Sequence, residues 1–404
     1  MARSRPWLRV LAMPALSIAC ASSACHRSQT GVAPQPGATG APAGEASVKV
    51  ALGGARRAAE AAKPHEKVDV PGGRFFAGSL PGDEGRDPTL EPLRDAYELA
   101  PYSIDVLPYP GEPGVPPLTA VTSGEAAKLC AARGERLCTE LEWERACRGP
   151  SGDAFSAGEA WDPSCVQTPD KCISGFGARM MGASLEEWTS SSIEPSGSTK
   201  AARVAVKGAY ATSAAPGHRC AVRHAFDPYG GNKSVGFRCC SGGDSAAEPK
   251  IATIEAKPTF RKVSLEASRL TAIFAAIPEL ARVRVSPHLF KETELAPVFE
   301  AKGLPDGEVV TSDPVLWSPV VGEELLVVAG KSKGGAFVVA LHRLPGDQYR
   351  LASSMLFPGE QGPIALVYQQ NLKKEILWTM GWKCAGEGGA VTYRDDHRVV
   401  VVQR

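Results

Sequence analysis

Residues 121–150 read VTSGEAAKLCAARGERLCTELEWERACRGP, and this stretch decides the fold of the chain around it. Thr122 followed by Glu125 forms a capping box, in which each of the two side chains accepts a hydrogen bond from the other residue's backbone N–H. Thr139 followed by Glu142 forms a second capping box. The stretch therefore predicts two short α-helices in close succession.

Glycines and a proline indicate where these two helices end. Gly134 is expected to supply the left-handed stop after the first helix, and Gly149 with Pro150 the stop after the second. Within the second helix, Trp143 and Cys147 are four residues apart and therefore lie on one face. The pattern predicts two capped helices joined by a tight turn, the second with a buried stripe.

The same residues resemble the signature of the formylglycine-generating enzyme (sulfatase-modifying factor) family, Gly-x-Arg-Leu-Pro-Thr-Glu-x-Glu-Trp-Glu-x-Ala-x-Arg-Gly. The positions that agree are Gly134, Arg136, Leu137, Thr139, Glu140, Glu142, Trp143, Glu144, Ala146, Arg148 and Gly149. Only the proline differs, because Cys138 stands in its place.

Other landmarks of that family follow one another in the expected order. They are VPGGRFFAGS at Val70–Ser79, YSIDVLPYP at Tyr102–Pro110, MGASLEEWT with Glu187 and Trp188 at Met181–Thr189, RCAVR with Arg219 and Arg223, and VGFRCC with Phe237 and Arg238 at Val235–Cys240. The resemblance implies an α+β, C-type-lectin-like fold for residues 67–242, rich in loops and stabilised by disulfides. The three arginines are expected to form structural salt bridges.

Cysteine usage favours an oxidising compartment. Eight of the eleven cysteines fall within one short stretch: Cys130, Cys138, Cys147, Cys165, Cys172, Cys220, Cys239 and Cys240. A zinc site is the alternative, but no CxxC pair with downstream ligands is present. Disulfides are therefore expected, while Cys384 stands apart.

The resemblance also implies how these cysteines pair. By analogy with the human-type enzyme, Cys130 pairs with Cys239, and Cys147 pairs with Cys220. We infer a local bridge between Cys165 and Cys172, which leaves Cys138 for Cys240. Each bridge is expected to contribute ~2–4 kcal/mol.

The residues that carry the family's chemistry are missing. Active members hold copper with two cysteines before the Arg-Cys-Ala segment, and Cu(I) requires such soft ligands. The corresponding segment here, KGAYATSAAPGHRC at Lys207–Cys220, has no cysteine before Cys220. His218 is its single metal-capable side chain and is expected to lie on the surface. We therefore assign no catalytic residue and no metal ligand.

The sequence also departs from the family's patterns for calcium and for iron. The Gly-Asn of a calcium-associated motif reads Ala183-Ser184, so calcium stays doubtful, although Glu187 is kept. Iron-dependent relatives draw on His-x-x-x-His pairs, and the seven histidines form none. No other cofactor is expected.

The N-terminus is typical of an exported protein. Residues 1–25 carry arginines, a short apolar stretch and small residues, as in a signal peptide, with Cys20 and Cys25 as lipidation candidates. Cleavage into the periplasm without lipidation is the alternative. Residues 26–66, rich in Ala, Gly and Pro, are expected to form a disordered tether.

The pattern changes after a second linker at residues 243–258. Apolar residues at helical spacing predict a helix over 264–277, ended by Pro278. From residue 316 on, strand-like runs alternate with turns. Residues 259–404 are therefore expected to form a small α+β domain, a helix packed on an antiparallel sheet.

These features favour a non-catalytic recognition or scaffold protein of the cell envelope, either lipid-anchored or periplasmic. The alternative is an oxidoreductase with an unrecognised metal site. With 45 Lys and Arg against 44 Asp and Glu, the charge does not suggest a nucleic-acid partner. An envelope protein, peptide or glycan is expected as partner. The lipid anchor is expected to attach the protein to the membrane.

Overall fold

The computed structural model describes residues 61–193, 203–243, 259–299, 308–359, 362–369, 375–380 and 388–404. The predicted signal peptide and nearly all of the predicted tether and second linker lie outside these residues, as do Cys20, Cys25 and Cys384. In the described part of the chain, no helix has the length and apolar character needed to cross a bilayer.

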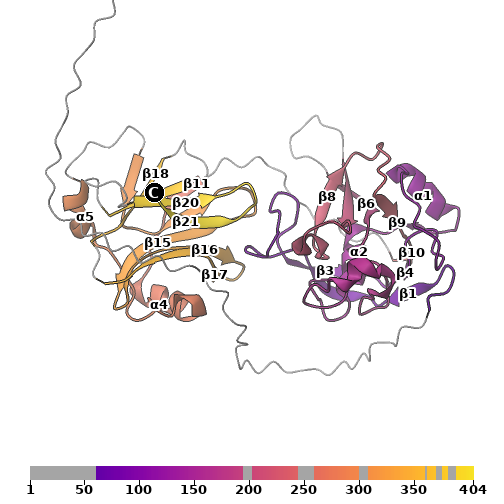
Figure 1. Cartoon of the computed structure of the whole chain (residues 1–404), viewed down its shortest axis with the longest axis horizontal. Helices are drawn as coiled ribbons and strands as arrows, with labels where there is room; N and C mark the ends of the chain where they lie inside the picture. The colour runs from indigo at the N-terminus through magenta and orange to yellow at the C-terminus, as the bar shows by residue number, and fades with distance from the viewer. Residues whose placement is uncertain are drawn as a thin grey trace, which may run out of the picture. The chain divides into compact units, whose positions relative to one another are not determined.

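Residues 61–243 form three small sheets and several short helices (Figure 1). One sheet has the order β1-β4-β10-β5, the second pairs β2 with β3, and the third has the order β8-β7-β6-β9. The strands are β1 (Lys67–Val70), β2 (Gly73–Ala77), β3 (Asp95–Leu99), β4 (Tyr102–Asp105), β5 (Arg136–Leu137), β6 (Glu186–Ile193), β7 (Arg203–Gly208), β8 (Arg223–Phe226), β9 (Val235–Phe237) and β10 (Cys239–Gly242). The helices are α1 (Ser123–Ala131), α2 (Glu140–Arg148), α3 (Ser164–Gln167), η1 (Pro169–Lys171) and η2 (Ala215–His218).

Both predicted capping boxes are present. The Thr122 side chain accepts a hydrogen bond from the Glu125 amide at the start of α1, and Thr139 and Glu142 do the same at α2. Gly149 ends α2 at a φ of 66°, a left-handed conformation that glycine adopts at no steric cost. The local sequence signals therefore place both helices correctly.

Helix α2 differs from the prediction because it is buried on every side. A single buried stripe was expected, whereas all nine of its residues are buried, including its glutamates and arginines. Leu141, Trp143 and Cys147 join a core with Ile104 and Met181. Removing charged side chains from water costs free energy, so a helix of such polar composition can be buried only when its charged groups find partners.

Residues 259–404 form a separate set of sheets. One has the order β11-β14-β15-β16-β17, with β12 pairing to β15, and the other has the order β13-β18-β19-β20-β21. The strands are β11 (Thr259–Lys262), β12 (His288–Leu289), β13 (Glu308–Thr311), β14 (Val315–Ser318), β15 (Leu325–Ser332), β16 (Gly335–Leu344), β17 (Gln348–Phe357), β18 (Ala365–Gln369), β19 (Glu375–Thr379), β20 (Gly388–Tyr393) and β21 (Val399–Gln403). The helices are α4 (Ala267–Ala275), η3 (Pro278–Leu280) and α5 (Glu292–Phe299).

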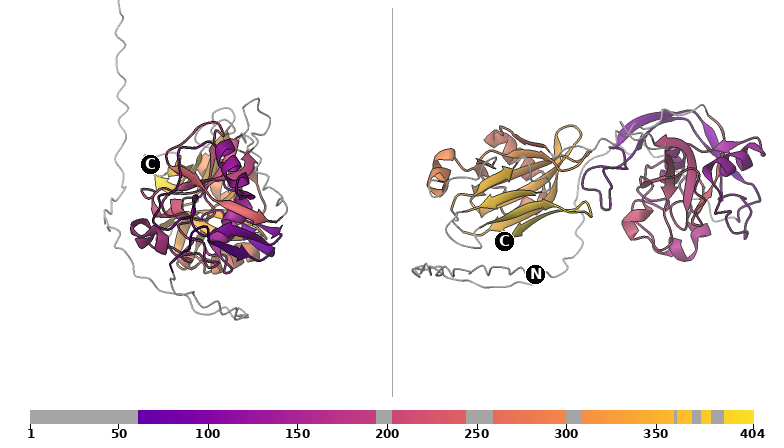
Figure 2. Two further views of the ribbon diagram at one scale, coloured as in Figure 1. Left: turned by 90° about the vertical axis from the view of Figure 1, so that its right-hand side faces the viewer. Right: turned by 90° about the horizontal axis from the view of Figure 1, so that it is seen from above.

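The sheet that contains β15 and β16 is covered on both faces, with α4 on one side and β20 and β21 on the other (Figure 1). Figure 2 shows the same sheets from two further directions. Val327 and Val338 point into a core shared with the second sheet, while Leu326 and Val339 point toward α4. This alternation follows from the two-residue period of a strand. The predicted helix on an antiparallel sheet is present, and a second antiparallel sheet closes the other face.

Candidate functional site

Glu187 and Arg238, two of the family-motif residues, form a buried ion pair. Nε and one Nη atom of Arg238 donate to the two carboxylate oxygens of Glu187 at 2.6 and 2.7 Å. The indole N–H of Trp143 donates to Glu187 as well, at 3.0 Å. These contacts join α2, β6 and the segment between β9 and β10, so they hold the fold.

Glu144 lies at the centre of a second buried network. Its carboxylate accepts hydrogen bonds from the Gly78 amide at 2.8 Å, Arg148 Nε at 2.9 Å and Lys207 Nζ at 3.0 Å. Burial by itself raises the pKa of Glu144, but Lys207, Arg148 and the Gly78 amide outweigh it and lower that pKa to about 2. Glu144 is therefore ionised at neutral pH and anchors the end of β7 to α2.

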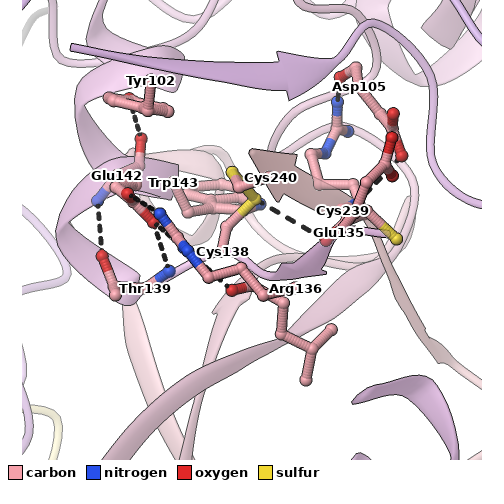
Figure 3. The surroundings of a disulfide bond; sticks show 12 residues. Tyr102, Asp105, Glu135, Arg136, Cys138, Thr139, Glu142, Trp143, Cys239 and Cys240 are labelled. Carbon is pink, nitrogen blue, oxygen red and sulfur yellow. Dashed lines mark hydrogen bonds and ion pairs between the residues drawn. A yellow bond between two sulfur atoms is a disulfide. The ribbon is translucent and has the colours of Figure 1, made fainter. Parts of the chain in front are cut away.

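The remaining charged motif residues are paired in the same manner. These pairs are Arg219 with Glu91, Arg223 with Glu140, and Arg136 with Glu142 (the last in Figure 3). Bidentate pairs of this kind fix both side chains in one orientation. The expected structural salt bridges of Arg219, Arg223 and Arg238 are thus present.

Four disulfides join parts of the domain, and two of them end on β10. They join Cys130 to Cys239, Cys138 to Cys240, Cys147 to Cys220, and Cys165 to Cys172. These are the pairs that the resemblance and our inference gave. Figure 3 shows the second of them beside the Arg136–Glu142 ion pair, where β5 and β10 meet.

The segment Lys207–Cys220 runs from the end of β7 through η2 into the bridge with Cys147. His218 in this segment is buried, although the sequence analysis expected it on the surface. Its ring stacks on Trp161 at 3.9 Å, and its Nδ1 and Nε2 lie 2.7 and 3.1 Å from the carbonyl oxygens of Gly182 and Ser213. The imidazole is therefore used to fix the loop.

A cavity of about 600 Å³ opens beside this segment. Its lining includes Pro216 and Arg219 from the segment, together with Phe155, Trp161 and the exposed Arg94. Phe155 and Trp161 are both partly exposed and contact each other. Many of the other side chains that line the cavity are charged, among them Asp83, Glu84 and Glu159, so two aromatic rings face a polar wall. A concave site of this volume is typical of small-ligand or peptide binding.

Glu186 marks a second place of interest, at the start of β6. Its side chain is 2 % exposed and its Oε1 lies 3.4 Å from His224 Nε2. Its Oε2 is buried and has no hydrogen-bond partner among the described residues. The partly exposed Tyr210, at the start of the Lys207–Cys220 segment, lies next to it.

The fold agrees with a comparison to known families. A family model described as a sulfatase-modifying factor enzyme 1-like domain matches residues 111–242. The chain contains a formylglycine-generating-enzyme-like domain. We call residues 61–243 the FGE-like domain, and the family match covers residues 111–242 of it.

Curated relatives of the FGE-like domain include both an inactive protein and an enzyme. The chain is 32% identical over 162 residues to the inactive C-alpha-formylglycine-generating enzyme 2 of Mus musculus, over 33% of this chain and 51% of that one. It is 36% identical over 100 residues to the hercynine oxygenase of Mycolicibacterium smegmatis, over 20% of this chain and 23% of that one. The chain thus spans about half of the first relative and about a quarter of the second.

A solved structure with a similar fold is PvdO from Pseudomonas aeruginosa. The two chains are 19% identical with a TM-score of 0.34, and the match covers 44% of this chain and 98% of PvdO.

The FGE-like domain does not offer the ligands that copper needs. The one sulfur of the Lys207–Cys220 segment belongs to Cys220 and is bonded to Cys147. Cu(I) prefers thiolates, and a disulfide sulfur is not one. At the calcium-associated motif, both carboxylate oxygens of Glu187 accept hydrogen bonds from Arg238. We derive no chemistry through either metal.

Sequence reasoning missed Glu186 in the FGE-like domain. The one signal for Glu186 is that two acids, Glu186 and Glu187, are adjacent in a strand. Both side chains are buried in β6. A carboxylate in a buried strand needs a partner. Glu187 has one in Arg238, while the surroundings of Glu186 emerge only when β6, β7, β8 and the 227–234 loop come together.

Proposed function

We propose that this protein is a non-catalytic recognition or scaffold protein of the cell envelope, and that its FGE-like domain binds a partner without modifying it. The observation that carries the proposal is the fate of the cysteines. All eight from Cys130 to Cys240 are used in disulfides. None of them is left as a thiol for the family's oxidation, and the Lys207–Cys220 segment, where active members carry their copper-binding cysteines, has no cysteine besides the bonded Cys220.

The cavity beside the Lys207–Cys220 segment is the recognition site that we favour. Its aromatic side chains Phe155 and Trp161 are partly exposed, and the Arg94 side chain is exposed as well. Aromatic and arginine side chains contribute a large share of the binding energy in protein interfaces. Among the partners expected from the sequence, a peptide segment of an envelope protein suits this lining best.

The Mus musculus relative supports the same proposal, because its name describes it as inactive. Location in the envelope is supported by the N-terminal sequence and by the four disulfides, which are typical of oxidising compartments. Lipidation at Cys20 or Cys25 would place the domain close to the membrane.

The test uses the full-length, oxidised protein immobilised on a support and exposed to an envelope fraction. A double variant, Phe155→Ala with Trp161→Ala, is compared with Tyr229→Ala, which removes an aromatic ring that is 83% exposed and does not line the cavity. We expect a partner that is retained by the native protein and by Tyr229→Ala and is lost with the cavity variant. Retention by all three proteins would contradict the proposed site.

A second measurement separates binding from catalysis. A sulfatase-type cysteine peptide is incubated with the protein, Cu(I), a reductant and oxygen, and is then analysed by mass spectrometry. We expect an unchanged peptide. A stoichiometric aldehyde product would show that the protein is an oxidoreductase after all.

A further inference from the structure

Buried acids in the FGE-like domain follow one rule with one exception. Seven acidic side chains are buried among the described residues of this domain, and six of them form an ion pair with lysine or arginine. The six are Glu91, Asp105, Glu140, Glu142, Glu144 and Glu187. The seventh, Glu186, pairs with no lysine or arginine of the described residues and contacts His224 instead.

The histidine does not supply the missing positive charge at neutral pH. Burial, and then the positive charge of Lys207, lower the pKa of His224 below its usual value near 6.5. Burial also raises the pKa of Glu186, and the Tyr210 hydroxyl lowers it in part. His224 is therefore mostly neutral at pH 7, so the contact of 3.4 Å between its Nε2 and Glu186 Oε1 is no ion pair there.

Other oxygen atoms surround the Glu186 carboxylate. Burial, and then the neighbouring Glu186 carboxylate, raise the pKa of Tyr210, whose hydroxyl bonds Ser234 Oγ. Ser234 in turn donates to Asn232 Oδ1 at 2.6 Å. Tyr210, His224, Asn232 and Ser234 are all partly exposed, and Tyr210 and His224 lie next to the buried carboxylate.

We propose that Glu186 is the anionic anchor of a second binding site, which accepts an alkylammonium group such as a lysine side chain of a partner. The unpartnered Oε2 of Glu186 would accept one N–H. The neighbouring hydroxyl and amide oxygens are the acceptors for the other two. The ligand's ammonium group would supply the positive charge for Glu186. At the six other buried acids an internal lysine or arginine supplies that charge.

An ammonium group suits this arrangement better than a guanidinium group does. Guanidinium binds carboxylates through two parallel N–H bonds and therefore needs both oxygens. At Glu186 one oxygen faces His224 and only the other is unpartnered. This inference does not depend on the cavity at Trp161 and stands if that cavity binds nothing.

The experiment follows binding in the full-length protein labelled with 5-fluorotryptophan. Trp188 is a suitable reporter because its ring contacts Phe226, which in turn contacts His224. The probe is the peptide acetyl-Gly-Lys-Gly-amide, and acetyl-Gly-norleucine-Gly-amide is its uncharged counterpart. We expect a saturable shift of the Trp188 fluorine signal with the lysine peptide and none with the norleucine peptide.

Glu186→Gln removes the charge and keeps the shape of the side chain. It should weaken binding by at least about tenfold, the loss expected for a hydrogen bond to a charged group. Glu98→Gln, which changes an exposed acid on β3, is the control and should leave the affinity unchanged. Unchanged affinity in Glu186→Gln, or a Glu186-dependent response to Zn²⁺ or Ca²⁺ without a response to the lysine peptide, would overturn the proposal.

Stability distinguishes a binding role from a structural one. Because Glu186 has no cationic partner to lose, Glu186→Gln should be at least as stable as the native protein toward urea. Glu187→Gln should be destabilised, since it leaves Arg238 buried without its counter-charge. If both variants lost stability equally, Glu186 would be a structural residue and the proposal would fail.

Discussion

Lys207→Met tests whether the Glu144 network is held by charge. Methionine keeps much of the length of the lysine side chain and removes its ammonium group, which donates to Glu144 and to the Ala221 carbonyl at 3.0 and 3.2 Å. The change leaves Glu144 buried with Arg148 as its remaining cationic partner. We expect the FGE-like domain to be clearly less stable at pH 7.

The magnitude follows from the pKa of Glu144. Its fall from 4.5 to about 2 corresponds to about 3 kcal/mol, at 1.36 kcal/mol for each pH unit. Lys207 makes the largest favourable contribution to that fall, so its loss should cost a large part of this energy. Removing one partner of a buried ion pair costs about 3–5 kcal/mol in general, and this range is the upper limit for the loss of stability in Lys207→Met.

The sign of the pH dependence is fixed by the direction of the shift. A carboxyl group whose pKa is lowered on folding stabilises the native state fully above pH 4.5, and this contribution is lost as pH falls toward 2. The difference between the native protein and Lys207→Met should therefore shrink between pH 5 and pH 2. Below pH 2 the native protein holds an unpaired buried lysine, so its advantage should vanish.

The assay is urea unfolding of the full-length chain, followed through the fluorine signal of 5-fluorotryptophan at Trp143. This ring lies 6.0 Å from Lys207 Nζ and reports on the FGE-like domain alone. Lys128→Met, an exposed change of the same kind on α1, should alter stability by less than about 0.5 kcal/mol. A cost below 1 kcal/mol for Lys207→Met at pH 7, or one that does not fall with pH, would refute the reasoning.

Three further outcomes are expected. Replacing Cys147 and Cys220 by alanine should cost up to about 4 kcal/mol, against about 2–3 kcal/mol for Cys165 and Cys172, because the bridges span 73 and 7 residues; equal costs in urea unfolding would contradict the loop-entropy argument. Non-reducing peptide mapping should recover both bridges in the native protein. Glu187→Gln should cost about 3–5 kcal/mol in the same fluorine assay, since it strips the charge from a buried arginine's partner.

Local signals accounted for most of the secondary structure. The capping boxes at Thr122 and Thr139 fix the starts of α1 and α2, because the bonds that they make span only three residues. The strand-like runs after residue 316 correspond to β15 to β21, because alternation and turn residues are also local properties. The number of sheets was not foreseen, since strand pairing between distant segments leaves no such periodic mark.

The site divides in the same way. Absence of a cysteine before Cys220 could be read directly from the chain, and it carries the argument against copper chemistry. The burial of His218 could not, because it depends on Trp161, Gly182 and Ser213 meeting around one ring. A histidine in a loop gives no local sign of whether a cavity wall will form over it.

The sequence by itself determined the family fold, the capped helices and the set of cysteines, because these rest on spacing and on residue type. Only the tertiary structure decided which charges are compensated. Glu186 and Glu187 are neighbours in β6, yet one meets Arg238 and the other a neutral histidine. Their partners, Arg238 and His224, lie elsewhere in the sequence, and electrostatic pairing depends on distance in space.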